Sequence, residues 1–181
     1  MTIDSEIFKA GMRHLAGHVC LITTLTGDGM RSGLTATAVC SVSAAPPMLL
    51  CCIHQRSASH AAIRAAGRFA VNVLALEDRA LAERFAGPIS GDARFAQGLW
   101  SRLQTGSPVL DSALVNFDCR LAQSVDAGTH GILFGEIIAV RLRPDPAKPL
   151  LYAHGAYGAF EALDAAQHPE LLWTPSWEHD E

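Results

Sequence analysis

The sequence predicts a mainly β protein, in which an antiparallel, barrel-like sheet is flanked by small helices. Two runs rich in β-branched residues flank Gly27-Asp28-Gly29, a combination typical of a hairpin turn. A run over residues 113–125 alternates apolar and polar residues and turns at "AGTH" into "GILFGEIIAVRLR", which is largely apolar on both faces. A strand that is apolar on both faces is typical of a closed barrel. Because regular βαβ units are missing, we expect about six antiparallel strands in one barrel-like sheet.

The first element expected is a short amphipathic helix in "SEIFKAGMRHLAG". Ser5 is its candidate N-cap, and Gly17 ends the segment. Four apolar residues fall near one helical face: Ile7, Phe8, Met12 and Leu15. Two strands follow around the glycine turn, and Pro46 and Pro47 end the second of them. The next apolar run, "MLLCCI", is too short for a free-standing helix and is expected to be a buried strand.

Two further helices are expected in the middle of the chain. "SASHAAIRAAG" has a helix start at Ser57 and a C-terminal Gly67, and "RFAVNVLAL" after it is expected to be a strand. "EDRALAERFAG" places Leu81 and Phe85 on one helical face. Residues 88–110 mix Gly, Pro and Ser with scattered aromatics, which predicts an irregular surface excursion.

The alternating run over residues 113–125 predicts a long strand that is half exposed to solvent. Its polar positions include Asn116, Asp118 and Arg120, which the alternation directs away from the core.

Composition narrows the classes of protein to consider. The chain has 181 residues, enough for one domain, which we expect to span residues 1–165 with a C-terminal tail at 166–181. A hydrophobic content of 49%, only 18% charged residues and a mean hydropathy of +0.19 favour an obligate oligomer. The net charge of −4, with no Lys/Arg cluster, argues against a nucleic-acid partner. No membrane span or leader is recognised, so a cytoplasmic protein is expected.

The cysteines suggest neither disulfides nor a metal site. They are odd in number, have no CxxC spacing and lie on apolar, strand-like stretches: Cys20, Cys40, Cys51, Cys52 and Cys119. Buried, reduced thiols are therefore expected. Cys51, Cys52 and His54 do not form a credible metal site, because adjacent residues of a strand point to opposite faces.

The motifs of common catalytic nucleophiles and nucleotide loops are missing: GxSxG, HExxH, a Walker loop and GxGxxG after a strand. What remains is a binding architecture at the junction "CCIHQRSASHAAI". There a predicted strand leads into a predicted helix through a segment that contains Arg56, Ser57 and Ser59. The helix N-terminus together with these side chains could hold a phosphate. The alternative is that Ser57 only caps its helix and that Arg56 is solvated.

A run of small residues, "GLTATAVCSVSAAPP", precedes this junction. From Thr35 to Ser43 it offers backbone groups beside very small side chains, so a planar heterocycle could approach the main chain closely. A flat ring system with a phosphate tail would fit both features. Tight packing of strand against strand, or of subunit against subunit, would also explain the small residues.

Several motifs in a fixed order carry a family resemblance: "GLTATAVCSVSAAPPMLLCCIHQRSAS", "FAVNVL", "ERFAG", "FDCRLAQSVDAGTHGILFGEI" and "YAHGAYG". From about Phe8 to Phe160 the chain resembles the short-chain NAD(P)H:flavin oxidoreductases, the reductase components of two-component flavin monooxygenases. "GTH" and "RFAQGLW" look most like the reductases that serve 4-hydroxyphenylacetate hydroxylation and pyrimidine-ring degradation. The resemblance implies an FMN-binding split β-barrel of Greek-key-like topology, usually a homodimer, with flavin near the subunit interface.

The resemblance also implies a set of site residues. Thr35, Ala36 and Thr37 would follow the isoalloxazine edge, with Ser41, Val42 and Ser43 along its pyrimidine side and ribityl chain. Cys52 and Ile53 would line the groove, Arg56, Ser57 and Ser59 would face the phosphate, and Phe85, Ala86 and Gly87 would close the far end. His130, Tyr157 and Gly158 would border the nicotinamide. Thr129 and Ala156 stand where many relatives have Asp and Arg, which leaves NADH versus NADPH open.

The function implied is hydride transfer from NADH or NADPH to FMN or FAD, with reduced flavin passing transiently to a larger oxygenase. The chemistry needs nicotinamide C4 about 3 to 3.5 Å from flavin N5 and no indispensable acid or base, so His130 is expected to be a positioning residue. The alternative for His130 is a turn-capping or interface histidine. Two other functions stay open: reduction of a cobalt corrinoid or ferric chelate by bound flavin, and a non-enzymatic flavin-binding protein.

Overall fold

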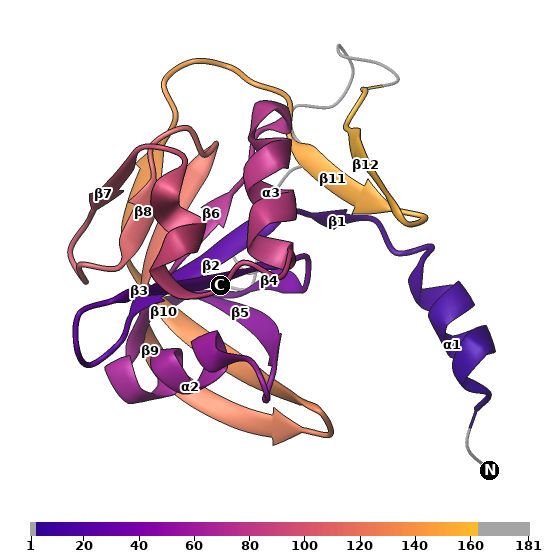
Figure 1. Ribbon diagram of the computed structural model, residues 1–181, viewed down its shortest axis with the longest axis horizontal. Helices are drawn as coiled ribbons and strands as arrows, with labels where there is room; N and C mark the ends of the chain where they lie inside the picture. The colour runs from indigo at the N-terminus through magenta and orange to yellow at the C-terminus, as the bar shows by residue number, and fades with distance from the viewer. Residues whose placement is uncertain (1–2, 163–181) are drawn as a thin grey trace, which may run out of the picture.

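The structure is a computed structural model that describes residues 3–162, and its centre is one antiparallel sheet (Figure 1). Seven strands form this sheet in the order β3 (Arg31–Ala36), β2 (Cys20–Leu25), β6 (Arg68–Val73), β9 (Val115–Ala127), β10 (His130–Leu142), β5 (Pro47–His54) and β4 (Val39–Ala44). A three-stranded sheet contains β1 (Gly17–His18), β11 (Leu150–Ala153) and β12 (Ala156–Ala159), and a two-stranded one contains β7 (Trp100–Arg102) and β8 (Pro108–Leu110). The mainly β, antiparallel prediction is confirmed.

The main sheet is split rather than closed. β3 and β4 follow each other in the chain but lie at opposite ends of the strand order, joined only by Thr37 and Ala38. At this point Cys52 N donates to Ala38 O at 3.0 Å, so the chain leaves the edge beside β2 and pairs with β5. The prediction of one continuous strand up to the prolines was therefore wrong. The split β-barrel that the resemblance implies agrees with this topology.

The helices are α1 (Ser5–Met12), α2 (Ala58–Ala66) and α3 (Arg79–Ala86). α2 begins and ends as predicted, because Ser57 caps it and Gly67 adopts a φ of 64°. α1 is capped one residue earlier than predicted: Asp4 Oδ1 accepts from Glu6 N at 2.8 Å and from Ile7 N at 3.1 Å. None of the helices in residues 3–162 is long and apolar enough to cross a membrane.

α1 stands away from the sheets and has no buried residue (Figure 1). The apolar side chains that the sequence placed near one face are exposed, with Ile7 at 65% and Phe8 at 52%. Eight residues are too few for a stable isolated helix in water. α1 therefore needs a surface to pack against.

The buried side chains form two clusters. One includes Leu21, Leu74 and Phe85 and extends under α3, while the other includes Ile22, Ile53 and Phe69 and lies between the main sheet and α2. Leu81 and Phe85 are buried on α3, as predicted.

The five cysteines are free, but only three of them fit the prediction of buried thiols. Cys20, Cys51 and Cys119 are buried, and burial raises the pKa of Cys20 and of Cys51 to about 12. Cys52 is half-buried. Cys40 is exposed because it lies on the edge strand β4.

The prediction that the polar residues of β9 point away from the core was wrong for two of the three. Asn116 and Asp118 are buried, whereas Arg120 is exposed as expected. Asn116 Nδ2 donates to Asn72 Oδ1 at 2.8 Å, and Asp118 Oδ2 accepts from Thr105 N at 2.7 Å. These partners stand on β6 and in the segment between β7 and β8, so the burial is satisfied by hydrogen bonds.

The region over residues 88–110 is more regular than predicted. It contains a 3₁₀ helix, Gly91–Ala96, and the β7–β8 hairpin, and this hairpin lies against the polar face of β9. The strands β11 and β12 were missed in the sequence. The predicted tail at residues 166–181 lies outside the described residues, and the 1–165 domain boundary stays a prediction.

Candidate functional site

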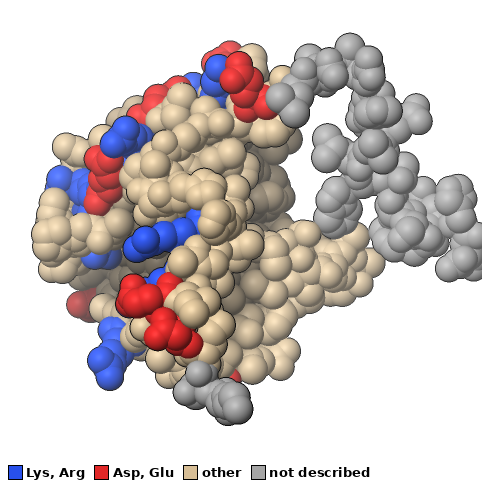
Figure 2. Space-filling model, turned by 90° about the vertical axis from the view of Figure 1, so that its right-hand side faces the viewer, with Lys and Arg blue, Asp and Glu red and all other residues tan. Residues whose placement is uncertain are grey.

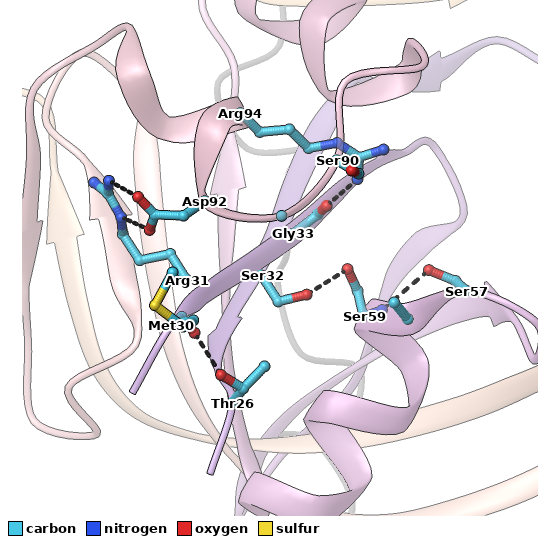
Figure 3. A pocket seen from close by; sticks show the side chains of 12 residues that line it. Thr26, Met30, Arg31, Ser32, Gly33, Ser57, Ser59, Ser90, Asp92 and Arg94 are labelled. Atoms are coloured by element: carbon cyan, nitrogen blue, oxygen red, sulfur yellow. Dashed lines mark hydrogen bonds and ion pairs between the residues drawn. The ribbon is translucent and has the colours of Figure 1, made fainter. Parts of the chain in front are cut away.

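The first cavity of interest lies at the start of α2 and has a volume of about 500 Å³ (Figure 3). Its walls are the beginning of β3, the first turn of α2 and the segment over residues 90–94. Ser57 and Ser59, both predicted to face a phosphate, line it. The structure thus brings two predicted residues together with a segment that the sequence did not connect to them.

Ser57 and Ser59 are fixed by local hydrogen bonds. Ser57 Oγ accepts from Ser59 N at 3.3 Å, which is the capping interaction of α2. The Oγ atoms of Ser59 and Ser32 lie 3.0 Å apart, and both side chains are buried. Ser57 therefore caps the helix and also lines the cavity, so the two interpretations of this residue are compatible.

The cations at the cavity differ from the one expected. Arg56 is exposed and is not part of the lining, whereas Arg31 and Arg94 are. Arg31 makes a bidentate pair with Asp92, with Nε to Oδ1 at 2.6 Å and Nη2 to Oδ2 at 2.7 Å. The hydrogen bond from Arg31 is the main cause that lowers the pKa of Asp92.

Arg94 is held by backbone carbonyls instead of a carboxylate. Its Nη1 donates to Gly33 O at 2.5 Å and its Nε to Ile89 O at 2.5 Å, and Nη2 donates to Gly87 O at 3.3 Å. Burial lowers its pKa. Within residues 3–162 no carboxylate pairs with Arg94, so this part-buried guanidinium leaves a net positive charge at the cavity.

A second cavity, of about 240 Å³, joins the predicted flavin edge to a predicted nicotinamide residue. Thr35, Ala36 and Thr37 line it together with Ala86 and Tyr157. Val19 and Tyr152 complete the lining. Here the structure brings together five residues of the predicted site, from β3, the residue that follows it, α3 and β12.

Two side chains fix the walls of this second cavity. Thr35 Oγ1 donates to Ala82 O at 2.7 Å, which ties β3 to α3. The guanidinium of Arg79 lies 5.4 Å from the ring centroid of Tyr157. Burial is the main cause that raises the pKa of Tyr157, and Glu83 and Tyr152 raise it further.

Other predicted residues lie away from these two cavities. On β4, Ser41 borders a third cavity, of about 240 Å³, while Val42 is exposed and Ser43 is half-buried. On β5, Cys52 is half-buried and Ile53 belongs to the core. Phe85 is buried beside Phe95 and Trp100, Gly87 follows α3, and Gly158 is exposed on β12. The break at Thr37 and Ala38 separates the β4 residues from the flavin edge.

His130 begins β10 and lies beside the loop that leads into α2. It pairs with His54 of β5, and the two ring centroids are 5.1 Å apart. Thr129 Oγ1 is 2.9 Å from His130 Nδ1, and Gln55 Nε2 donates to His130 O at 3.3 Å. The imidazole is therefore oriented by its neighbours while its side chain stays exposed.

Within residues 3–162, no group of three or more His, Cys, Asp or Glu side chains could hold a metal ion.

Comparison with known proteins gives a consistent set of relatives. Residues 12–161 match the family described as "Flavin reductase like domain". The chain is 44% identical over 150 residues to "FMN reductase (NADH) RutF" of Variovorax paradoxus, covering 83% of this chain and 82% of that protein. It is also 44% identical over 147 residues to the protein of the same name from Stutzerimonas stutzeri, covering 81% of this chain and 83% of the relative.

Solved structures agree with these relatives. A putative flavin reductase from Haemophilus somnus superposes with a TM-score of 0.84 at 35% identity, covering 87% of this chain and all of the other (100%). BorF, the flavin reductase component of a bacterial two-component tryptophan halogenase, superposes with a TM-score of 0.80 at 29% identity, covering 88% of this chain and 99% of its own.

Proposed function

Because this chain belongs to the flavin reductase-like domain family, we propose that it is an NADH:FMN oxidoreductase that transfers a hydride from NADH to FMN. The observation that carries this proposal is the pair of cavities at the two ends of β3. One offers serine hydroxyls and an unneutralised guanidinium, and the other offers a run of small residues beside Tyr157.

The residues present fit the phosphate of a flavin mononucleotide. Arg94 supplies a part-buried positive charge, and Ser57 and Ser59 supply hydroxyls at the N-terminus of α2. A dianionic phosphate is favoured at such a place, because charge-assisted hydrogen bonds are roughly twice as strong as neutral ones. Arg56 lies in the loop that leads into α2, and we propose that it reaches the phosphate from the solvent side.

The second cavity fits the edge of a flat ring. Thr35, Ala36 and Thr37 present small side chains there, so a ring can approach the backbone of β3. We propose that Tyr157 and His130 border the nicotinamide. They lie at different parts of the described chain, Tyr157 beside α3 and His130 beside the loop that leads into α2. Contacts from the remaining residues of the predicted set stay predictions: Ser41, Val42, Ser43, Cys52, Ile53, Phe85, Ala86, Gly87 and Gly158.

The side chains of this site position reactants and do not exchange protons. Bound flavin supplies the electron-accepting ring system for the hydride. The chain's own task is to hold two flat rings in stacked geometry, and proximity and orientation then lower the barrier. His130 suits this task because Thr129 and His54 orient its ring. Hydrogen bonding at Nδ1 leaves Nε2 as the atom available to a ligand.

The direct test of the proposed function is turnover with free flavin in excess. Purified protein with NADH and a large molar excess of FMN should oxidise many equivalents of NADH per protein chain. Oxidation of no more than one equivalent would contradict an FMN reductase and favour a non-enzymatic flavin-binding protein. Parallel assays with a ferric chelate and with a cobalt corrinoid would favour the alternative acceptors if these are reduced faster than excess FMN.

We also propose that reduced flavin passes transiently to a larger oxygenase. The structural neighbour BorF supports this idea, since BorF is the flavin reductase component of a two-component tryptophan halogenase. A cytoplasmic location stays a prediction from the sequence.

We further propose that the functional form is a homodimer, and α1 supports this. Its exposed apolar side chains Ile7, Phe8 and Met12 need a partner surface. Figure 2 views the molecule from the α1 side and shows charged side chains at its centre and left, with a broad surface free of them at the lower right. Burial of the exposed apolar side chains of α1 against a partner would remove them from water.

The dimer can be tested by sedimentation or gel filtration. At low micromolar concentration the protein should behave as a particle of twice 19.3 kDa. Ile7→Ser together with Phe8→Ser should yield monomers, because both remove apolar surface from α1. Glu6→Ser, which changes a charged residue of the same helix, is the matched control and should remain dimeric. A stable and fully active wild-type monomer would contradict the proposal.

A further inference from the structure

A side chain of α2 packs closely against the backbone beside the β9–β10 turn. His60 on α2 is 4% exposed and packs against Gly131, the second residue of β10. A Cβ atom on residue 131 would lie 2.2 Å from His60 Nε2, whereas real Cβ atoms essentially never come closer than 3.0 Å to a neighbour. A side chain at position 131 would therefore force the buried imidazole or the turn to shift.

The imidazole of His60 acts as a packed neutral group. Its Nε2 is buried and has no hydrogen-bond partner within the described residues. The charged groups that act on it are Arg64 on its own helix and Asp126 on β9, which lie 3.6 Å apart as an ion pair. Burial is the main cause that lowers the pKa of His60, Arg64 lowers it further, and Asp126 opposes them.

Other contacts join the residues just before α2 to the same turn. Gln55 N donates to Thr129 O at 3.0 Å, and Gln55 Nε2 donates to His130 O at 3.3 Å. The ring of His54 packs edge-on against that of His130. The loop over residues 54–57, which includes Ser57, is therefore tied by these contacts to the turn that carries His130.

We propose that His60 and Gly131 are a positioning pair that sets how closely the first turn of α2 approaches the β9–β10 turn and so places His130. The inference rests on the proposed function, in which α2 faces the flavin phosphate and His130 borders the nicotinamide. His60 touches neither ligand and acts through the backbone of residues 130 and 131. Its volume, and not its proton, is what the site uses.

The test introduces a steric clash at residue 131 and then removes it by shortening the side chain of residue 60. Gly131→Ala should raise the KM for NADH about tenfold at saturating FMN, because the added Cβ pushes the turn away from His60. His60→Ala in the same chain should restore the KM to within about twofold of wild type, because it frees the space that the Cβ needs. Gly27→Ala is the matched control, since a Cβ there meets nothing within 4 Å.

A His130→Ala background shows whether the pair acts through His130. If it does, Gly131→Ala should cause no further rise in KM for NADH in that background. A double variant no better than Gly131→Ala alone, or an undiminished effect of Gly131→Ala without His130, would overturn the positioning role. A His130→Ala variant with wild-type kinetics would instead overturn the placement of the nicotinamide.

The pH dependence of thermal unfolding gives a second readout. Because the pKa of His60 in the folded protein is lowered, the unfolded chain binds this proton more readily. The contribution of the neutral ring to stability should be complete above about pH 6.5 and fall as the pH drops toward the folded pKa. His60→Leu should remove this part of the pH dependence. An unchanged pH profile in His60→Leu would contradict the neutral, packed ring.

Discussion

Replacing Arg56 and Ser57 together with alanine is expected to weaken FMN binding at least about tenfold, with little change in the binding of riboflavin. The two ligands differ only in the phosphate, and a hydrogen bond to a charged group contributes about 1.5 to 3 kcal/mol. Dissociation constants for both ligands can be measured by quenching of flavin fluorescence. Equal losses for FMN and riboflavin would refute the phosphate assignment.

The structure makes this experiment more discriminating, because a second arginine lies at the same cavity. Arg94→Gln removes the charge but keeps a side chain that can still donate to the carbonyl of Gly33. If Arg94 supplies the charge, this variant should also lose FMN selectively, by about tenfold or more. Arg102→Gln, on the exposed position of β7, is the matched control and should bind FMN normally. If FMN affinity falls only in Arg94→Gln, and not in the Arg56 and Ser57 variant, the phosphate must be assigned to a deeper position in the cavity, away from Arg56.

Local chemistry explains which elements the sequence could predict. The ends of α2 depend on a serine cap and on a glycine with positive φ, and both are visible as residue types. The hairpin between β2 and β3 follows from the glycine turn, where Gly29 has a φ of 83°. Ser57 and Ser59 could be predicted as candidate site residues for the same reason, since they lie at a helix N-terminus, and both line the cavity there.

Tertiary contacts decide what the sequence could not show. Asn116 and Asp118 alternate with apolar residues, yet the β7–β8 hairpin covers their face and supplies their partners. The break at Thr37 arises because the chain pairs with β5 after this point, and the sequence there has no Gly or Pro that would predict a turn. Arg94 reaches Gly33 across 61 residues, so nothing in the sequence near α2 points to it. The motif "RFAQGLW" contains Arg94, but the sequence does not show that the side chain points toward Gly33.

The His130→Ala variant is expected to slow hydride transfer by about 10- to 100-fold and to raise the KM for NADH, while the affinity for FMN changes little. The imidazole is oriented by Thr129 and His54 and lies on the turn next to the phosphate loop. Removing it leaves the serines of α2 in place. The loss should therefore appear on the dinucleotide side of the site only.

The pH dependence of this rate separates positioning from proton transfer. A positioning imidazole gives a rate of flavin reduction that varies weakly between about pH 6 and 8, whereas a required acid or base gives a tenfold change per pH unit that the variant lacks. Stopped-flow measurement of the loss of oxidised-flavin absorbance, for wild type and His130→Ala across this range, records both cases. A steep limb confined to the wild type would make His130 an acid or base. Weaker FMN binding in the variant would place His130 on the flavin side of the groove, because a residue that touches only the dinucleotide cannot change the affinity for flavin alone.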